Sequence, residues 1–242
     1  MDDTGRFEVR PRISEHSAHL ALVALCIALA GLLVSAPLVT GIGQDLPLIS
    51  RLAPNKGSGP VQIPGAFLYH QQRSLSCEYA SLHIASTMLG NPVSEYDFEA
   101  IVPRSENPHK GYRGDIHGNW GNTTDCGVYA GPLALALALQ TFGFTGEVFY
   151  GDRGELAFRL DRGHPTVVWL AMRGAVDSFD AWDAEGSRFQ LTRWMHVMVA
   201  YGYDDGGVYL TDPGIAEYRY YGWDQFLAMW GVMDGMAISV SR

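Results

Sequence analysis

The chain has 242 residues, of which 47% are hydrophobic and 18% are charged, and its formal net charge at pH 7 is -9. The acidic balance argues against nucleic-acid binding, because that binding depends on Lys and Arg neutralising phosphates. The three cysteines (Cys26, Cys77 and Cys126) have no paired spacing, which argues against a disulfide framework or a zinc site. We expect neither a metal nor an organic cofactor.

The N-terminal part of the chain is predicted to hold one membrane-spanning segment. Residues 1–18 form a short polar tail, and an apolar run from Leu20 to Val39 then reaches the about 20 residues needed to cross a bilayer. We assign residues 19–40 as a transmembrane anchor. A cleaved signal peptide and a buried helix are the alternatives, and Pro37 directly after a small-residue pair counts against cleavage.

Basic residues flank this run unequally, which sets the expected orientation. They are Arg6, Arg10 and Arg12 before it, against Arg51 and Lys56 after it. The bias favours a C-terminal domain on the outer face of the membrane. Residues 41–60 are rich in Gly and Pro and are predicted to be a linker. The remaining residues, 61–242, are enough for a single folded domain with its own hydrophobic core.

The first half of this domain is predicted to be helical. A helix from Ser76 to Leu89 places Cys77 in its first turn, and Ser94-x-x-Asp97 resembles a capping box that opens a second short helix. A Gly/Asn-rich loop follows over residues 103–127, long enough to indicate a functional role. Gly131-Pro132 then opens a run of alternating Leu and Ala, which we assign to a helix rather than a strand because of its length and its first-turn proline.

The second half is predicted to be mainly strands. MHVMVAYGY, then a DDGG turn, then VYLTD is typical of a β-hairpin over residues 195–212. A polar loop is expected before it at residues 173–192. The remaining expected elements are strands at 146–150, 166–172, 217–221 and 235–240 and helices at 154–160 and 222–230. This order favours an α+β fold with a helical part followed by an antiparallel sheet, rather than a doubly wound sheet.

Three residues in this plan form a candidate catalytic set. Cys77 lies at a helix start, where backbone N–H groups and the helix dipole favour a thiolate, although taken alone it is better explained as a small buried hydrophobic residue on the helix face. His196 begins the first strand of the hairpin and Asp212 ends the second, so both lie at one end of the same ribbon. They come within diagonal reach if they share a face or if a bulge intervenes. His196 would then act as base and Asp212 would orient its ring.

An oxyanion donor is also expected ahead of the nucleophile. Gln71, six residues before Cys77, can turn its amide towards the thiol, and Gln72 is a near-equal candidate. Together with the Cys77 backbone N–H, such a donor contributes about 2.7–4 kcal/mol in comparable sites.

These residues give the chain a specific resemblance. Gln71-x5-Cys77, the strand beginning at His196 and Asp212-Pro213-Gly214 resemble the papain clan, and within it the bacteriocin-processing (double-glycine leader) peptidases and their stand-alone relatives. Weaker matches are Gly163 to Trp169, which resembles the strand before the histidine, and Tyr129 to Leu139, which resembles the helix after the loop. The resemblance implies a papain-like cysteine peptidase fold from roughly Ile63 to Val240.

The chain also departs from that pattern. Glu78 follows the cysteine where such peptidases often carry glycine, and a carboxylate beside the thiol opposes its ionisation. The transporter and ATPase of leader-peptide exporters have no counterpart here, so leader processing coupled to export is not supported.

Cys126 is the competing nucleophile, or the partner of Cys77 in an inactivating disulfide. His109, Asp115 and His117 match no zinc signature and are expected in a solvated or substrate-facing loop, and Asn119 and Trp120 are candidates to line the cleft.

The predicted function is hydrolysis of peptide bonds through a Cys77–His196–Asp212 triad, with Gln71 in the oxyanion hole and a thioester intermediate. The expected partners are a peptide or protein substrate and, through the N-terminal helix, a membrane; the domain is expected outside the cytoplasm, or secreted if the N-terminal segment is cleaved. Transglutaminase-type amide transfer is one alternative, because it uses the same order of residues. A catalytically inactive, membrane-tethered peptide-binding domain is the other. The oligomeric state is left open.

Overall fold

The computed structural model describes residues 59–139 and 142–242. The predicted anchor and most of the predicted linker lie outside these residues, so the membrane-spanning segment stays a prediction. Within the part of the chain that the structure describes, no helix is both long enough and apolar enough to span a bilayer.

Five helices of this region follow the sequence prediction closely. They are α2 (Cys77–Met88), α3 (Glu95–Ile101), α4 (Ala130–Leu139), α5 (Arg153–Leu160) and α6 (Trp223–Gly231). The capping box at the start of α3 is confirmed, because the Ser94 hydroxyl accepts from the Asp97 backbone N–H and the Asp97 carboxylate accepts from the Ser94 backbone N–H. The Leu/Ala run is a helix, as its length indicated.

One antiparallel sheet forms the centre of the domain. Its strands run in the order β2-β9-β3-β6-β7-β8, and the short β1 pairs with the far end of β6. The bounds are β1 (Val61–Gln62), β2 (Thr145–Tyr150), β3 (Thr166–Ala171), β6 (Met195–Tyr203), β7 (Gly207–Asp212), β8 (Glu217–Gly222) and β9 (Met236–Ser241). The predicted α+β class with an antiparallel sheet is confirmed.

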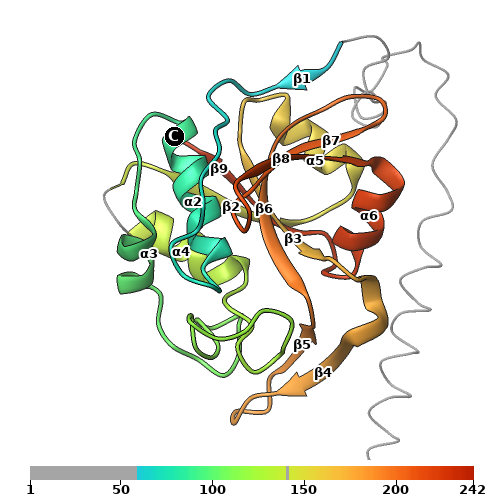
Figure 1. Ribbon diagram of the computed structural model, residues 1–242. Helices are drawn as coiled ribbons and strands as arrows, with labels where there is room; N and C mark the ends of the chain where they lie inside the picture. The colour runs from blue at the N-terminus through green and yellow to red at the C-terminus, as the bar shows by residue number, and fades with distance from the viewer. Residues whose placement is uncertain (1–58, 140–141) are drawn as a thin grey trace, which may run out of the picture. The chain divides into compact units, whose positions relative to one another are not determined.

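Helices cover both faces of the sheet (Figure 1). Side chains alternate along a strand, so Val167 and Trp169 of β3 pack with α2 and α4, whereas Val168 and Leu170 pack with α5 and α6. Trp169 is fully buried and donates its indole N–H to the Val128 carbonyl, which ties the sheet to the chain just before α4. Strand β6 lies between the two apolar layers, with Val197 and Val199 in one and Met198 and Ala200 in the other.

The prediction of a polar loop over residues 173–192 is wrong. A 3₁₀ turn (Gly174–Asp177) is followed there by a two-stranded hairpin, β4 (Ser178–Trp182) and β5 (Arg188–Thr192). This hairpin is separate from the central sheet and projects from it (Figure 1). Its sequence gives a weak strand signal because only β5 has an apolar buried side, formed by Phe189 and Leu191 against Cys126. The two-residue β1 was also not predicted.

The β6–β7 hairpin contains a bulge that matters for the site. The paired residues are Tyr203–Val208, Gly202–Tyr209, Ala200–Leu210 and Val199–Thr211. Tyr201 is therefore an extra residue on β6. A regular hairpin would place Val199 opposite Asp212, on the wrong face for a contact with His196. The shift of one residue instead brings Asp212 level with Met198, and hence onto the face that carries His196.

Candidate active site

Cys77 is the first residue of α2, and the preceding segment is held from several directions. Ser76 is the N-cap residue, but its hydroxyl bonds to the Arg73 backbone instead of capping the helix. The Leu75 carbonyl accepts a hydrogen bond from the Tyr112 hydroxyl at 2.5 Å. These contacts fix the entry into α2 and bury Cys77 at 7% exposure.

His196 and Asp212 meet at the end of the β6–β7 hairpin. His196 Nε2 lies 2.6 Å from Asp212 Oδ1, and the backbone N–H of Gly214 donates to the same oxygen at 2.9 Å. Burial of Asp212 acts to raise its pKa, but the hydrogen bond and charge of His196 outweigh this and hold the pKa below its usual value. Because Nε2 is taken by Asp212, Nδ1 is the ring nitrogen left for a reacting group.

Cys77 contacts the backbone of β6 at the residue that follows His196. Strand β7 pairs with β6 only from Val199 onwards, so the polar groups of Val197 contact α2. The Val197 carbonyl accepts from the Ser81 hydroxyl at 3.2 Å, and the Val197 N–H favours the ionised form of Cys77. Cys77 thus lies beside the residue next to His196.

Glu78 makes the direct contact with the sulfur. The Cys77 thiol donates to Glu78 Oε2 at 3.4 Å, and the Val128 backbone N–H donates to Glu78 Oε1 at 3.1 Å. Burial, followed by the charge of Glu78, raises the pKa of Cys77 well above its ordinary value. The expected lowering by the helix start is therefore outweighed, while the expected opposition of Glu78 to ionisation is confirmed in direction.

The side chain of Gln71 is turned towards its own loop. Its Nε2 donates to the Arg73 and Ser74 carbonyls at 2.9 and 2.8 Å, and its backbone N–H donates to the Pro213 carbonyl at 2.9 Å. Gln71 Oε1 is buried without a hydrogen-bond partner among the described residues. Gln71 therefore lies next to the segment that follows Asp212, with both amide hydrogens engaged.

Gln72 is exposed, and its hydrogen bonds go to Glu95 and His70. Its backbone N–H donates to Glu95 Oε1 at 2.9 Å, and its side chain donates to the His70 carbonyl at 3.1 Å. Glu95 Oε2 also lies 3.4 Å from the buried Arg73 guanidinium. These contacts tie the segment before Cys77 to α3.

A loop segment covers the sulfur. The Trp120 indole N–H donates to the Met195 carbonyl at 2.7 Å, and its ring lies edge-on to His196 at 6.1 Å between centroids. The cavity beneath has a volume of about 20 Å³, which is room for about one water molecule. Its lining includes Leu75, Cys77, Glu78, Trp120, Asn122 and Cys126. Trp120 lines the cavity that contains Cys77, as expected from the sequence.

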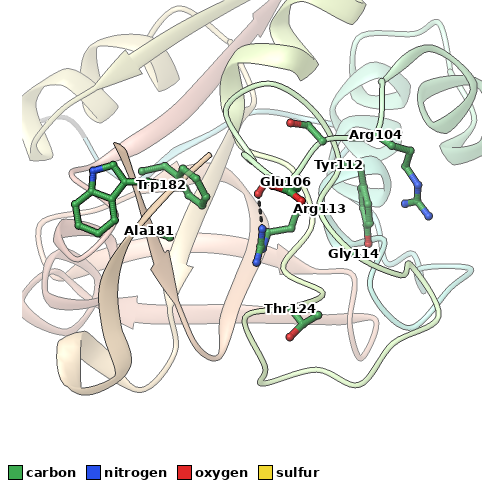
Figure 2. Close-up of a pocket in the computed structure, with 10 residues that line it drawn as sticks. Arg104, Glu106, Tyr112, Arg113, Gly114, Thr124, Ala181 and Trp182 are labelled. Atoms are coloured by element: carbon green, nitrogen blue, oxygen red, sulfur yellow. Dashed lines mark hydrogen bonds between the residues drawn. The ribbon is translucent and has the colours of Figure 1, made fainter. Parts of the chain in front are cut away.

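A larger groove lies on the other side of the same loop (Figure 2). Its volume is about 740 Å³, and it is bounded by Trp182 and Ala181 of β4 and, across the opening, by Arg113 and Thr124. Thr124 lines the groove while Asp125 lines the Cys77 cavity, so a short stretch of loop separates the two spaces. Trp182 is 62% exposed.

Cys126 and His109, the other residues considered for a catalytic or metal-binding role, lie in the loop over residues 103–127. Cys126 is a free thiol packed against Phe189, and burial raises its pKa to about 12. His109 packs edge-on to Tyr129. Among the described residues, no cluster of three or more His, Cys, Asp or Glu is arranged to hold a metal ion. Sequence reasoning missed the contact of Glu78 with both the thiol and the loop, although Glu78 was visible as a departure next to the cysteine.

The α+β domain has a cysteine at the start of α2 and a histidine–aspartate contact at the end of the β6–β7 hairpin of its antiparallel sheet, which is the arrangement expected from the sequence for a cysteine peptidase. Residues 65–238 match the model of the Peptidase_C39-like family, and the chain belongs to that family, whose members are peptidases generally of the cysteine type.

Individual relatives are distant. The chain is 23% identical over 165 residues to the uncharacterized protein YvpB of Bacillus subtilis strain 168, covering 68% of this chain and 64% of YvpB. A crystal structure of a protein described as a C39-like peptidase from Bacillus anthracis superposes with a TM-score of 0.66 at 22% identity, covering 76% of this chain and 98% of that one. The peptidase domain of Streptococcus ComA, a bifunctional ABC transporter, gives a TM-score of 0.47 at 17% identity, covering 73% and 98%.

Proposed function

We propose that the protein is a cysteine peptidase in which Cys77 is the nucleophile, His196 the base and Asp212 the group that orients the base. The observation that carries the proposal is the 2.6 Å contact between His196 Nε2 and Asp212 Oδ1, next to Val197, whose backbone contacts Cys77 and Ser81 of α2. This contact leaves Nδ1 of His196 to accept the thiol proton.

The proposed reaction is acyl transfer through a thioester. The Cys77 sulfur attacks the scissile carbonyl carbon while its proton passes to His196, which then protonates the leaving amine. Water, deprotonated by His196, hydrolyses the thioester and releases the acid. Asp212 stabilises the imidazolium, because its carboxylate accepts the Nε2–H bond in a partly buried position.

Gln71 is proposed to join the oxyanion hole with the Cys77 backbone N–H. Both of its amide hydrogens are engaged with loop carbonyls in the resting structure, so one of them has to leave the Ser74 carbonyl for the oxyanion. The unpartnered, buried Oε1 costs little to reorient, since it gives up no hydrogen bond among the described residues.

The substrate is proposed to be a peptide or protein segment that lies in the groove beside Trp182 and reaches Cys77 once the covering loop has moved. We place the reaction outside the cytoplasm, on a domain held by the apolar run from Leu20 to Val39.

An epoxide inhibitor of papain-like enzymes tests the nucleophile directly. We expect a single adduct that maps to Cys77, and Cys77→Ala abolishes both labelling and hydrolysis of a protein substrate. The matched control is Cys126→Ala, which removes the other buried thiol that lines the same cavity and is expected to retain most of the activity. An adduct on Cys126 would overturn the assignment.

A further inference from the structure

Glu78 is a buried carboxyl group with two specific contacts and no countercharge. It is 1% exposed, and its two oxygens accept from the Cys77 thiol and from the Val128 backbone N–H. A Cβ atom on Gly127 would clash sterically with Glu78 Oε1, so glycine is required there for the carboxyl group to fit. The site is therefore built around this side chain.

The other titratable groups near Glu78 do not neutralise it. Tyr79 on α2, Tyr112 in the long loop and Tyr129 at the loop's end have pKa values raised by burial, as does Cys126, so all four stay protonated near neutral pH.

The nearby carboxylates have partners of their own. Glu95 on α3 pairs with Arg73, Asp125 in the loop accepts from the Asp115 backbone N–H, and Asp212 on β7 pairs with His196 of β6. Among the described residues, no Lys or Arg lies within ion-pair distance of Glu78.

We propose that Glu78 and Cys77 share one negative charge between them and compete for it, next to the His196–Asp212 pair. While Glu78 is ionised, Cys77 is held as a neutral thiol that donates to Oε2. When Glu78 is protonated, its O–H donates to the sulfur and the thiolate forms instead. Glu78 thus sets the protonation state of the nucleophile, and the inference rests on the proposed role of Cys77.

The proton balance of the two forms is simple. In the resting form the thiol proton stays on sulfur and the negative charge on Glu78. In the reactive form Glu78 has taken up one proton from solvent, and the thiol proton passes to Nδ1 of His196, which gives a thiolate–imidazolium pair. Burial raises the pKa of Glu78 to about 7, so this carboxyl group gains and loses its proton near neutral pH.

Alkylation of Cys77 in the full-length protein tests this competition without any substrate. The rate of reaction with iodoacetamide is measured against pH, with the modified peptide assigned by mass spectrometry. In Glu78→Gln the amide oxygen can still accept from Val128 while an N–H faces the sulfur. We expect the midpoint of the alkylation curve to fall by about one pH unit or more relative to the parent.

A purely structural role predicts another outcome. Glu78→Gln would then lower the melting temperature and leave the alkylation midpoint where it is in the parent, and that result overturns the proposal. If Glu78→Gln fails to fold, the parent protein is used with 13C-labelled glutamate. The buried carboxyl then titrates by NMR near the pH at which the Cys77 alkylation curve inflects, and separate midpoints overturn the proposal.

Failure of this inference and failure of the proposed function are distinguishable. A shifted alkylation midpoint in a protein that hydrolyses no peptide supports the role of Glu78 and rejects peptidase activity. An unshifted midpoint in a protein that does hydrolyse peptides rejects the role of Glu78 and leaves the peptidase in place.

Discussion

The buried carboxyl of Glu78 makes the stability of the fold depend on pH in a direction opposite to that of an ordinary paired carboxylate. Burial raises its pKa to about 7 in the folded state, against 4.5 for an unperturbed group. The folded protein therefore binds more protons than the unfolded chain between these values, and stability falls as pH rises through about 7. The difference in pKa corresponds to about 3 kcal/mol, a large part of the usual 5–15 kcal/mol of a domain.

Comparison with Glu78→Gln isolates this contribution, because the variant has no ionisation at the site. Urea unfolding followed by tryptophan fluorescence gives the free energy of unfolding of both proteins at a series of pH values. We expect the parent to lose about 3 kcal/mol relative to the variant between about pH 4.5 and pH 8. A difference between parent and variant that does not change with pH would refute the reasoning, since Glu78 would then have the same pKa in both states.

Three further predictions concern catalysis, substrate and location. Asp212→Ala should lower kcat/KM by about 100-fold or more because nothing then orients the His196 ring, while Asp212→Asn is milder because an amide oxygen still accepts the Nε2–H bond; equal losses would contradict this. Trp182→Ala should raise KM several-fold with kcat unchanged, as expected for loss of about 1 kcal/mol of aromatic contact in the groove, and an unchanged KM would place the substrate elsewhere. Protease added to intact cells should degrade residues 61–242, whereas protection until lysis would show the opposite orientation.

The local elements could be predicted from the sequence because their signals are local. The capping box of α3 and the turn between β6 and β7 each depend on a few neighbouring residues. The β4–β5 hairpin could not be predicted in the same way. Its strands pair only with each other in the described structure, and Phe179 and Trp182 of β4 are exposed, so no regular alternation of buried apolar residues marks it.

The candidate site was predictable as a set of residue types, but its contacts were not. Neighbouring residues on a helix do not normally face each other, yet Glu78 reaches the thiol of the residue before it, because Cys77 occupies the first position of α2. The orientation of the Gln71 amide depends on carbonyl groups of its own loop, which the sequence does not position. Likewise, the bulge at Tyr201 decides the face of Asp212, and no residue type marks it in advance.

Gly214 offers a test of how closely the His196–Asp212 contact is constrained. A Cβ atom at this position would lie 3.0 Å from His196 Cε1 and 3.1 Å from Nε2, closer than ordinary van der Waals contact. Gly214→Ala should therefore displace the ring by a few tenths of an ångström and lower kcat more than it raises KM, with the free energy of unfolding changed by about 1–3 kcal/mol at most. The matched control is Gly231→Ala at the end of α6, where an added Cβ meets nothing within 4 Å and kcat should not change. Folded Gly214→Ala protein with the parent's kcat would show that the reaction does not depend on the position of this imidazole.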